Sequence, residues 1–510
     1  MKEAHPLTAL LDSAARERGN EVSIIDPHRG WTPKQLLARA DTLAKCLNAV
    51  GVRPGDRVLV RGRNSGDLVA RIFAAWRLGA IVVPIHEQVG ANRLAAIVAD
   101  ALPSAYVVDD ALTGPEHHPA LPDHVAVIVS SAESVTPVVA RNRATLELEP
   151  PGDSAALLIY TSGSTAAPLG VACPGTAIIF ALDAIHQELG YNDSDRVLGL
   201  LPLAFDYGLY QVLLALKAHA VVILEDGLQH PHRIPRLLAE QSISVFPALP
   251  SIFGSLLRAR WLATEQRTLR LLTSTGESFP PAMVDQLRSC FPTARVAPMY
   301  GLTECKRVSI QGVDVPNSAR YSVGRALPGT TAWVGDGLGR PMPPGEEGEL
   351  FVRGPHLMTG YWRNAAATTV RYQDIGGERT LRSGDIFQMD EAGYLTFVRR
   401  EGGFLKAKGQ RFSPAEIEAS LVTLPEVSAA VAVGYINPDG EDSVAMFVVG
   451  DAIAEARVRQ HCARHLQRAA MPTLIHILDE PLPSNGNGKY DRRALAAFAQ
   501  ELSMHQRHRR

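Results

Sequence analysis

A loop rich in serine, threonine and glycine is the first candidate for chemistry in this sequence. The segment Leu157–Val171 reads LLIYTSGSTAAPLGV, an apolar run typical of a strand followed by Ser162, Gly163, Ser164 and Thr165. Glycine lets the backbone approach a phosphate closely, and successive backbone N–H groups form an anion-binding nest that hydroxyls reinforce. The segment predicts a polyphosphate-binding loop, although loops of this kind also serve as linkers.

Four further distinctive segments follow this loop. In order they are MYGLTECKR at Met299–Arg307, RSGDIF at Arg382–Phe387, RREGGFLKAKGQRFSPAEIE at Arg399–Glu418 and PLPSNGNGKYDRR at Pro481–Arg493. Together with VRPGDRVLV at Val52–Val60 and WRLGAIVVPI at Trp76–Ile85, they closely resemble the AMP-forming adenylating enzymes. That superfamily holds the acyl-CoA synthetases, the amino-acid adenylation domains of peptide synthetases, and luciferase. The resemblance spans nearly the whole chain and is nearest to stand-alone amino-acid or acyl ligases with an FDYG segment.

The composition is that of a large soluble enzyme. The chain has 510 residues, of which 46% are hydrophobic and 20% charged, and its net charge is −2. A chain of this length exceeds a single hydrophobic core, so two or more domains are expected. The near-neutral charge argues against nucleic acid or an anionic membrane as the main partner. Five scattered cysteines without metal-ligand spacing, and the lack of an 18-residue apolar run, favour a cytoplasmic protein without a membrane span.

Short Val/Ile/Leu runs alternate with Ala/Leu-rich helical patterns along most of the chain. This alternation is typical of an α/β fold with mostly parallel sheets and flanking helices. From about Val334, short strands and Gly/Pro turns predict a β-rich subdomain. The resemblance implies a large N-terminal adenylating domain at 1–400, a hinge at 401–403, and a small mobile α+β lid domain at 404–510, whose size suits independent folding.

The resemblance implies a reaction in two halves. A carboxylate attacks the α-phosphate of ATP to give an acyl-adenylate and pyrophosphate, and the pantetheine thiol of a carrier protein or of CoA then displaces AMP. The phosphate charge must be neutralised, which Mg²⁺, a lysine and oriented dipoles can do. By the resemblance, Glu304 helps to hold Mg²⁺, Thr303 contacts the α-phosphate, and Lys489 bridges the reacting carboxylate and that phosphate. These three are the candidate catalytic residues.

The resemblance also implies which residues bind ATP. Tyr300 stacks on adenine, Asp385 accepts hydrogen bonds from the ribose hydroxyls, which suits a short fixed acid, and Arg400 assists it. The other ATP-binding candidates are Thr161, Ser162, Gly163, Ser164, Thr165, Gly276, Glu277 and Gly301. The simpler interpretation of MYGLTE is an apolar strand end followed by a turn.

The phosphate loop departs from the family pattern at two positions. Ala166 stands where the family carries a second glycine, and Leu169 stands where it carries a lysine. Losing one charge-assisted contact to the phosphates costs about 1.5–3 kcal/mol, so weaker pyrophosphate handling is expected. Lys306 is a candidate for the replacement cation.

The predicted hinge is the third departure. The family commonly carries Arg, any residue, then Asp, whereas here Arg400 and a glutamate precede Gly402 and Gly403. Glycine has wide φ/ψ freedom, so the pair permits the domain rotation between the two half-reactions while omitting the acid. Lys406 and Gly409 match the segment that lines the thiol tunnel after this rotation, so transfer to a thiol is expected.

The segment LPLAFDYGLYQ is the best clue to the substrate. Asp206 lies in an apolar, aromatic run, where a carboxylate is costly to bury unless it is paired. In amino-acid-activating members, the aspartate at this position binds the α-ammonium of the substrate. The alternative is that Asp206 is the N-cap of the helix that follows. The other pocket candidates are Tyr207, Tyr210, Met299, Arg307 and Val308.

Arg307 is the most informative of these pocket candidates. A guanidinium that faces the substrate favours a second carboxylate or another acceptor group, because it presents two parallel N–H donors. It could equally pair with a protein acid such as Glu277.

The leading hypothesis is an AMP-forming ligase that activates an amino acid or related small carboxylic acid and passes it to a carrier protein in trans or to CoA. A carrier in trans is expected because no carrier-like attachment site follows Arg493. The alternatives are an acyl-CoA ligase for a non-amino acid, an adenylating enzyme with a non-thiol acceptor, and a nucleotide-binding protein that has lost turnover.

Overall fold

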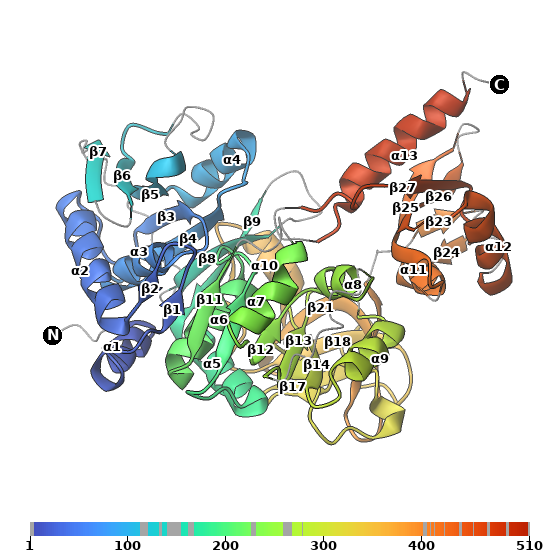
Figure 1. Cartoon of the computed structure of the whole chain (residues 1–510), viewed down its shortest axis with the longest axis horizontal. Coiled ribbons are helices and arrows are strands. Elements are labelled where there is room, and N and C mark those ends of the chain that lie inside the picture. Colours follow the sequence, from blue (N-terminus) through green and yellow to red (C-terminus); the bar gives the residue numbers. More distant parts are fainter. Residues whose placement is uncertain are drawn as a thin grey trace.

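The computed structural model covers the chain in several described stretches. These are residues 5–112, 121–131, 135–139, 155–161, 168–225, 231–258, 268–277, 279–400, 405–407, 410–412, 414–422, 424–437, 441–451, 453–466, 470–485 and 489–507. In Figure 1 the segments coloured blue to light orange form a large body, and the segments after about residue 405, in orange to red, gather to one side of it.

Two large sheets carry the N-terminal part of the chain. The first orders its described strands as β19 (Gly360–Tyr361), β9 (Leu169–Pro174), β8 (Ala155–Thr161), β4 (Ile81–His86), β3 (Arg57–Gly62), β5 (Ala105–Asp109), β6 (Ala126–Ser130) and β7 (Val135–Val139). The second runs β16 (Arg325–Ala326), β15 (Ser309–Ile310), β14 (Arg295–Tyr300), β13 (Leu271–Ser274), β12 (Val245–Pro247), β10 (Arg196–Gly199), β11 (Val221–Leu224), β1 (Ile24–Ile25) and β2 (Gly30–Trp31). Their central strands are parallel.

Smaller sheets complete the structure. An antiparallel sheet holds β17 (Thr331–Gly335), β18 (Gly348–Arg353), β20 (Tyr372–Ile375), β21 (Glu378–Met389) and β22 (Leu395–Arg400). The C-terminal part has a hairpin of β23 (Leu405–Ala407) and β24 (Gln410–Phe412), and a sheet of β25 (Val427–Ile436), β26 (Asp442–Gly450) and β27 (Leu474–Leu478).

Helices cover these sheets. They are α1 (Thr8–Glu17), α2 (Pro33–Ala49), α3 (Gly66–Arg77), α4 (Ala91–Ala101), α5 (Gly175–Leu189), α6 (Asp206–Ala218), α7 (Ile234–Glu240), α8 (Pro250–Arg258), α9 (Pro281–Cys290), α10 (Ala365–Arg371), α11 (Pro414–Val422), α12 (Glu455–His465) and α13 (Arg492–Arg507). Every residue of α3 except the last is buried, as expected for a helix that lies inside a domain. Ser65 caps α3 by accepting the N–H of Leu68 at 3.1 Å.

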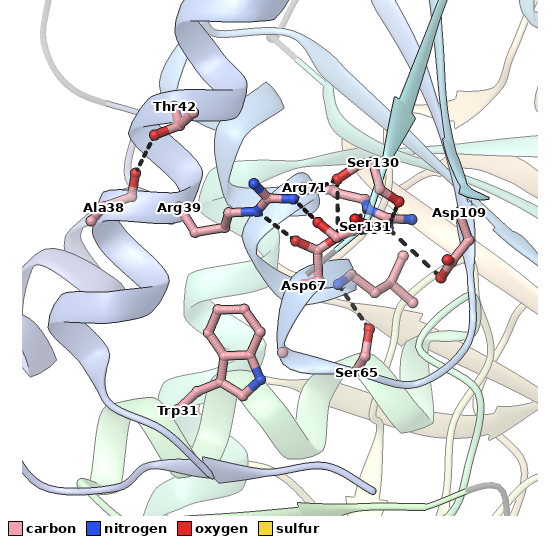
Figure 2. A network of polar contacts seen from close by, with 12 residues as sticks. Trp31, Ala38, Arg39, Thr42, Ser65, Asp67, Arg71, Asp109, Ser130 and Ser131 are labelled. Atoms are coloured by element: carbon pink, nitrogen blue, oxygen red, sulfur yellow. Dashed lines mark hydrogen bonds and ion pairs between the residues drawn. The ribbon is translucent and has the colours of Figure 1, made fainter. Parts of the chain in front are cut away.

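A buried polar network joins α2, α3 and β6 (Figure 2). Asp67 accepts hydrogen bonds from Arg39 Nε at 2.7 Å, from Arg71 Nε at 2.7 Å and from Ser130 Oγ at 3.0 Å. Arg71 also donates to the Ser130 carbonyl at 2.8 Å. Because each of these buried charges has an opposite charge and hydrogen bonds, the network fixes the edge of the first sheet against its helices.

The predicted α/β fold with mostly parallel sheets and a β-rich subdomain is confirmed. The subdomain is the antiparallel sheet of β17 to β22. In the described part of the chain, the buried apolar residues from Leu405 onward pack in clusters of their own. Among the described helices, none combines the length and the apolar character that crossing a bilayer requires.

The Asp67 network yields a stability prediction. Asp67→Ala leaves the buried Arg71 with only the more distant carboxylate of Asp109, at 3.7 Å, so we expect a loss of about 3 kcal/mol in the free energy of unfolding. Urea unfolding followed by circular dichroism measures it. Glu240→Ala is the control, because its ion pair with Arg236 is largely exposed and exposed pairs contribute about 0–1 kcal/mol. Equal effects of the two substitutions would contradict the assignment.

Candidate functional site

A tight turn between β14 and β15 supplies the central residues of the site. The two strands pair through Met299 with Ile310 and Tyr300 with Ser309. Gly301 opens the turn, and a Cβ at this position would lie 1.9 Å from the carbonyl oxygen of Lys306. No side chain fits there, so the chain folds back on itself only because residue 301 is glycine. The turn presents Thr303, half-buried, and then a run of buried residues that begins at Glu304.

One side of the turn forms a buried carboxylate site. Tyr300 donates its hydroxyl to Asp385 Oδ2 at 2.7 Å, and the ring of Phe387 meets the Tyr300 ring edge-on at 4.6 Å. Asp385 pairs with Arg400 across β21 and β22, and Arg400 Nε lies 3.5 Å from Asp385 Oδ1. Burial raises the pKa of Asp385 above its ordinary value, while Arg400 and Tyr300 oppose the rise. The arrangement holds one carboxylate in a fixed orientation.

Glu304 lies in a second polar site beside the turn. Its Oε1 accepts the hydroxyl of Tyr361 at 2.6 Å, and its backbone carbonyl accepts the hydroxyl of Tyr372 at 2.8 Å. Burial lowers the pKa of Arg371, but Glu304 and neighbouring groups together raise it above its ordinary value. Within the described residues, no cluster of His, Cys, Asp and Glu is arranged to hold a metal ion. A single carboxylate suits Mg²⁺ when phosphate oxygens and water supply the other ligands.

Lys489 reaches the N-terminal part of the chain from the C-terminal part. A Cβ at Gly276, which has a φ of +90°, would lie 3.3 Å from Lys489 Cε and 3.4 Å from Nζ. Asn485 holds the lysine backbone through hydrogen bonds of 2.7 and 3.2 Å. Burial raises the pKa of Glu277, and the Lys489 ammonium opposes that rise. Helix α8 of the N-terminal part also contacts strand β25 of the C-terminal part.

The substrate candidates gather where α6 begins. Asp206 is the first residue of α6, preceded by Phe205 as N-cap, and its Oδ1 accepts the N–H of Tyr207 at 2.8 Å. Tyr207 donates to the Thr273 carbonyl at 2.9 Å. Arg307 lies over the Tyr207 ring, 5.5 Å from its centroid. Met299, Tyr210 and Val308 are buried in the same core cluster.

Part of the predicted site lies outside the described residues. This part comprises Ser162, Gly163, Ser164, Thr165, Gly402, Gly403 and Gly409. The backbones of Thr161 and Lys406 lie in β8 and β23, and Leu169 begins β9, where it pairs with Thr161.

Sequence reasoning missed Tyr361 and Arg371, the neighbours of Glu304. Both lie more than fifty residues beyond Glu304 in the chain, on β19 and α10. An aromatic residue in GYW and an arginine at the end of a short helix carry no local signal of this contact.

A family model described as AMP-binding enzyme matches residues 11–362, and one described as AMP-binding enzyme C-terminal domain matches residues 416–489.

Two curated relatives and one solved structure illustrate the similarity. CymA, a probable nonribosomal peptide synthetase of Salinispora arenicola, is 31% identical over 502 residues, which are 97% of this chain and 6% of that protein. The L-proline–[L-prolyl-carrier protein] ligase of Pseudomonas fluorescens is 29% identical over an alignment of 499 positions that covers 93% of this chain and 96% of that protein. The anthranilate CoA ligase AuaEII in complex with anthranoyl-AMP has a TM-score of 0.83 at 22% identity over 98% of both chains, a likeness of fold.

The burial of Asp385 yields a prediction about stability. Because the native pKa of Asp385 lies above the unfolded value, its charged form destabilises the native state at neutral pH, and this penalty vanishes as the pH falls below the unfolded pKa. Asp385→Asn is therefore expected to raise the urea midpoint at pH 7, with a gain that shrinks toward about pH 4.

Asp195→Asn is the matched control for this prediction. Asp195 is also buried, but Arg270, the Asn192 N–H and Ser244 hold the pKa of its carboxyl below the ordinary value against the effect of burial. Its removal should lower the urea midpoint at pH 7. The interpretation of Asp385 is wrong if both variants are destabilised to the same degree.

Proposed function

The chain belongs to the family of AMP-binding enzymes, and from this premise we propose that it is an ATP-dependent, AMP-forming ligase for a small carboxylic acid, in the first instance an amino acid. The observation that carries the proposal is the position of Lys489. It extends from the C-terminal part of the chain to Gly276, and the neighbouring Thr275 accepts a hydrogen bond at 2.6 Å from Arg307 of the turn that bears Glu304.

Asp385, Tyr300 and Arg400 form the proposed nucleoside site. The Tyr300 hydroxyl donates a hydrogen bond to Asp385 Oδ2, and Asp385 Oδ1 accepts hydrogen bonds from the ribose hydroxyls. A carboxylate that is already oriented loses little freedom when it binds, which favours affinity. Arg400 is largely exposed and lies near Oδ1, where its charge opposes the rise in the pKa of Asp385 that burial causes.

Glu304 and Thr303 form the proposed phosphate side. Mg²⁺ carried by ATP would be held by Glu304, whose orientation Tyr361 fixes, and it would neutralise phosphate charge. Thr303 donates to an α-phosphate oxygen. The phosphate loop at Ser162–Thr165 supplies further N–H and hydroxyl donors in this proposal.

Lys489 acts in the proposed chemical step by stabilising charge. One carboxylate oxygen of the acid forms a bond to the α-phosphorus, and the bond from that phosphorus to the pyrophosphate oxygen breaks. The ammonium contacts both the carboxylate and the α-phosphate, so it holds the two anions together and offsets the charge that develops between them.

A pantetheine thiol is the proposed acceptor, on a carrier protein in trans or on CoA. The relative from Pseudomonas fluorescens is by name a ligase that acts on a carrier protein, and it has nearly the same length. The thiol sulfur bonds to the acyl carbon and its proton is released to solvent, while the bond from that carbon to the bridging oxygen breaks and AMP leaves with this oxygen. We place the hinge for the second half-reaction at 401–403, between a large domain at 1–400 and a lid domain at 404–510. We place Lys406 and Gly409 in the thiol tunnel.

All five cysteines are free thiols, which supports a cytoplasmic location.

A second candidate is a ligase for an acid without an α-amine. Asp206 would bind the ammonium of an amino acid, but Lys306 Nζ already lies 3.8 Å from its Oδ2. An amine on the substrate would therefore meet a carboxylate that is partly neutralised. A panel of acids with and without the amine separates the two candidates.

The role of Lys489 is tested by substitution. Lys489→Ala is expected to lower acid-dependent ATP–pyrophosphate exchange about 10²–10³-fold, as loss of one preorganised group that stabilises the transition state does, with ATP binding retained. Isotope exchange and nucleotide titration measure the two quantities. Full exchange activity in the variant would remove Lys489 from the mechanism.

Gly276 gives an independent test of the same contact. Gly276→Ala introduces a Cβ against Lys489 at a backbone φ of +90°, so exchange should fall at least about tenfold, equal to 1.4 kcal/mol in the barrier. Gly51→Ala is the matched control, because Gly51 has a φ of +93° and a Cβ added there would meet nothing within 4 Å. If both variants lose exchange equally, backbone strain and not the lysine contact is responsible.

A further inference from the structure

Two buried cations face the start of α6 from the turn between β14 and β15. Lys306 has a φ of +61°, an uncommon conformation for a residue with a side chain, and its side chain is 2% exposed. This conformation turns the lysine toward Asp206, whose side chain keeps 25% exposure. Arg307 follows directly and is also buried.

Neither cation is fully engaged. Lys306 Nζ lies 3.8 Å from Asp206 Oδ2, beyond hydrogen-bond distance, and the hydrogen-bonding group beside it is the Cys173 thiol, whose sulfur is a weak acceptor. Arg307 donates from Nη1 to Thr275 Oγ1 at 2.6 Å. Within the described part of the chain, Lys306 Nζ, Arg307 Nε and the Tyr210 hydroxyl have no hydrogen-bond partner of good geometry. Buried donors of this kind are normally satisfied, so three together call for an acceptor.

The acids nearby have other partners. Glu304 receives the Tyr361 hydroxyl and lies near Arg371. Glu277, the expected protein partner of Arg307, accepts the N–H of Ser251 at 3.2 Å and lies near Lys489. Among the described ion pairs, none joins Arg307 to Glu277, so the alternative that this acid neutralises Arg307 is not what the structure contains.

Lys306 is also badly placed to replace the missing lysine of the phosphate loop. Leu169 pairs with Thr161 at the loop end of β9, whereas Cys173, which adjoins the lysine, pairs with Leu157. Leu169 and Cys173 are four residues apart in the strand, which corresponds to about 13 Å. The ammonium therefore lies at the depth of Asp206, on the side of the acid substrate.

The charges of this cluster do not balance. The charge of Glu304, which also acts on Lys306, is matched by Arg371. Of the remaining groups, Lys306 and Arg307 contribute two positive charges and Asp206 one negative charge, so the cluster carries +1. Apart from the reacting carboxylate, a neutral amino acid such as proline would add its ammonium and raise the total to +2 in a buried place. A substrate whose far end is a carboxylate brings the total to 0, which burial favours strongly.

We propose that the acid activated by this enzyme carries a second carboxylate, which Arg307 and Lys306 bind while the first carboxylate reacts. The inference rests on the proposed function and names its substrate class as dicarboxylic acids. Arg307 offers the unpartnered Nε for a charge-assisted hydrogen bond, Lys306 offers its ammonium, and the Tyr210 hydroxyl is a third donor. Asp206 keeps Lys306 charged and oriented.

The test compares acids with their amides, which match in shape and differ in the second charge. ATP–pyrophosphate exchange is measured with succinate against succinamate, aspartate against asparagine, and glutamate against glutamine. We expect kcat/KM for the favoured dicarboxylic acid to exceed that of its amide at least tenfold. Arg307→Met and Lys306→Met should each bring this ratio close to one, mainly through KM.

Lys217→Met is the matched control, because Lys217 forms a surface pair with Asp183 on α6 and α5. It should leave the ratio unchanged. A neutral acid or amino acid that exchanges as fast as any dicarboxylic acid would overturn the inference and leave the proposed function standing.

Direct binding separates the inference from turnover. Calorimetric titration of succinate and succinamate into the full chain with a non-hydrolysable ATP analogue reports the pocket alone. Tighter binding of succinate, lost in Arg307→Met, without exchange by any acid would support the inference and count against the proposed function. Equal binding of acid and amide across all three pairs would overturn the inference.

Discussion

The close approach at Gly301 is the constraint on which the site depends. Because the Lys306 carbonyl oxygen occupies the space of a Cβ at Gly301, the chain reverses within a few residues and presents Glu304, Lys306 and Arg307 from one turn. The pairing of β14 with β15 fixes the base of this turn. Side chains from β21, β19 and α6 then meet it at Tyr300, Glu304 and Lys306. A bulkier residue at 301 would separate all these groups together.

Burying so many polar groups costs stability, and the structure offsets that cost elsewhere. The Asp67 network pairs every charge that it buries, whereas burial raises the pKa of Asp385 above its ordinary value in spite of its partners. Lys306 and Arg307 are buried cations with open donor positions. This contrast between a satisfied scaffold and an unsatisfied site is expected when a site is organised for a ligand and not for stability.

Much of this organisation could be predicted from the sequence. Alternating apolar runs and helical patterns gave the α/β fold, and ordered motifs placed Asp385, Glu304 and Lys489 in one proposed site. The hydrogen bond from Tyr361 to Glu304 and the electrostatic interaction of Glu304 with Arg371 could not be predicted, because they join residues more than fifty positions apart. The pairing of Lys306 with Asp206 depends on a backbone φ of +61°. Neither composition nor periodicity carries that information.

The proposed activity depends on the attack of a carboxylate oxygen on the α-phosphorus of ATP. The most direct test uses an acid labelled with ¹⁸O in its carboxylates, incubated with enzyme, ATP, Mg²⁺ and a thiol acceptor, followed by mass spectrometry of the nucleotide. The bond changes proposed above leave one ¹⁸O in the AMP, because the bridging oxygen departs with it. AMP without the label, or ADP as the nucleotide product, would contradict attack at the α-phosphorus.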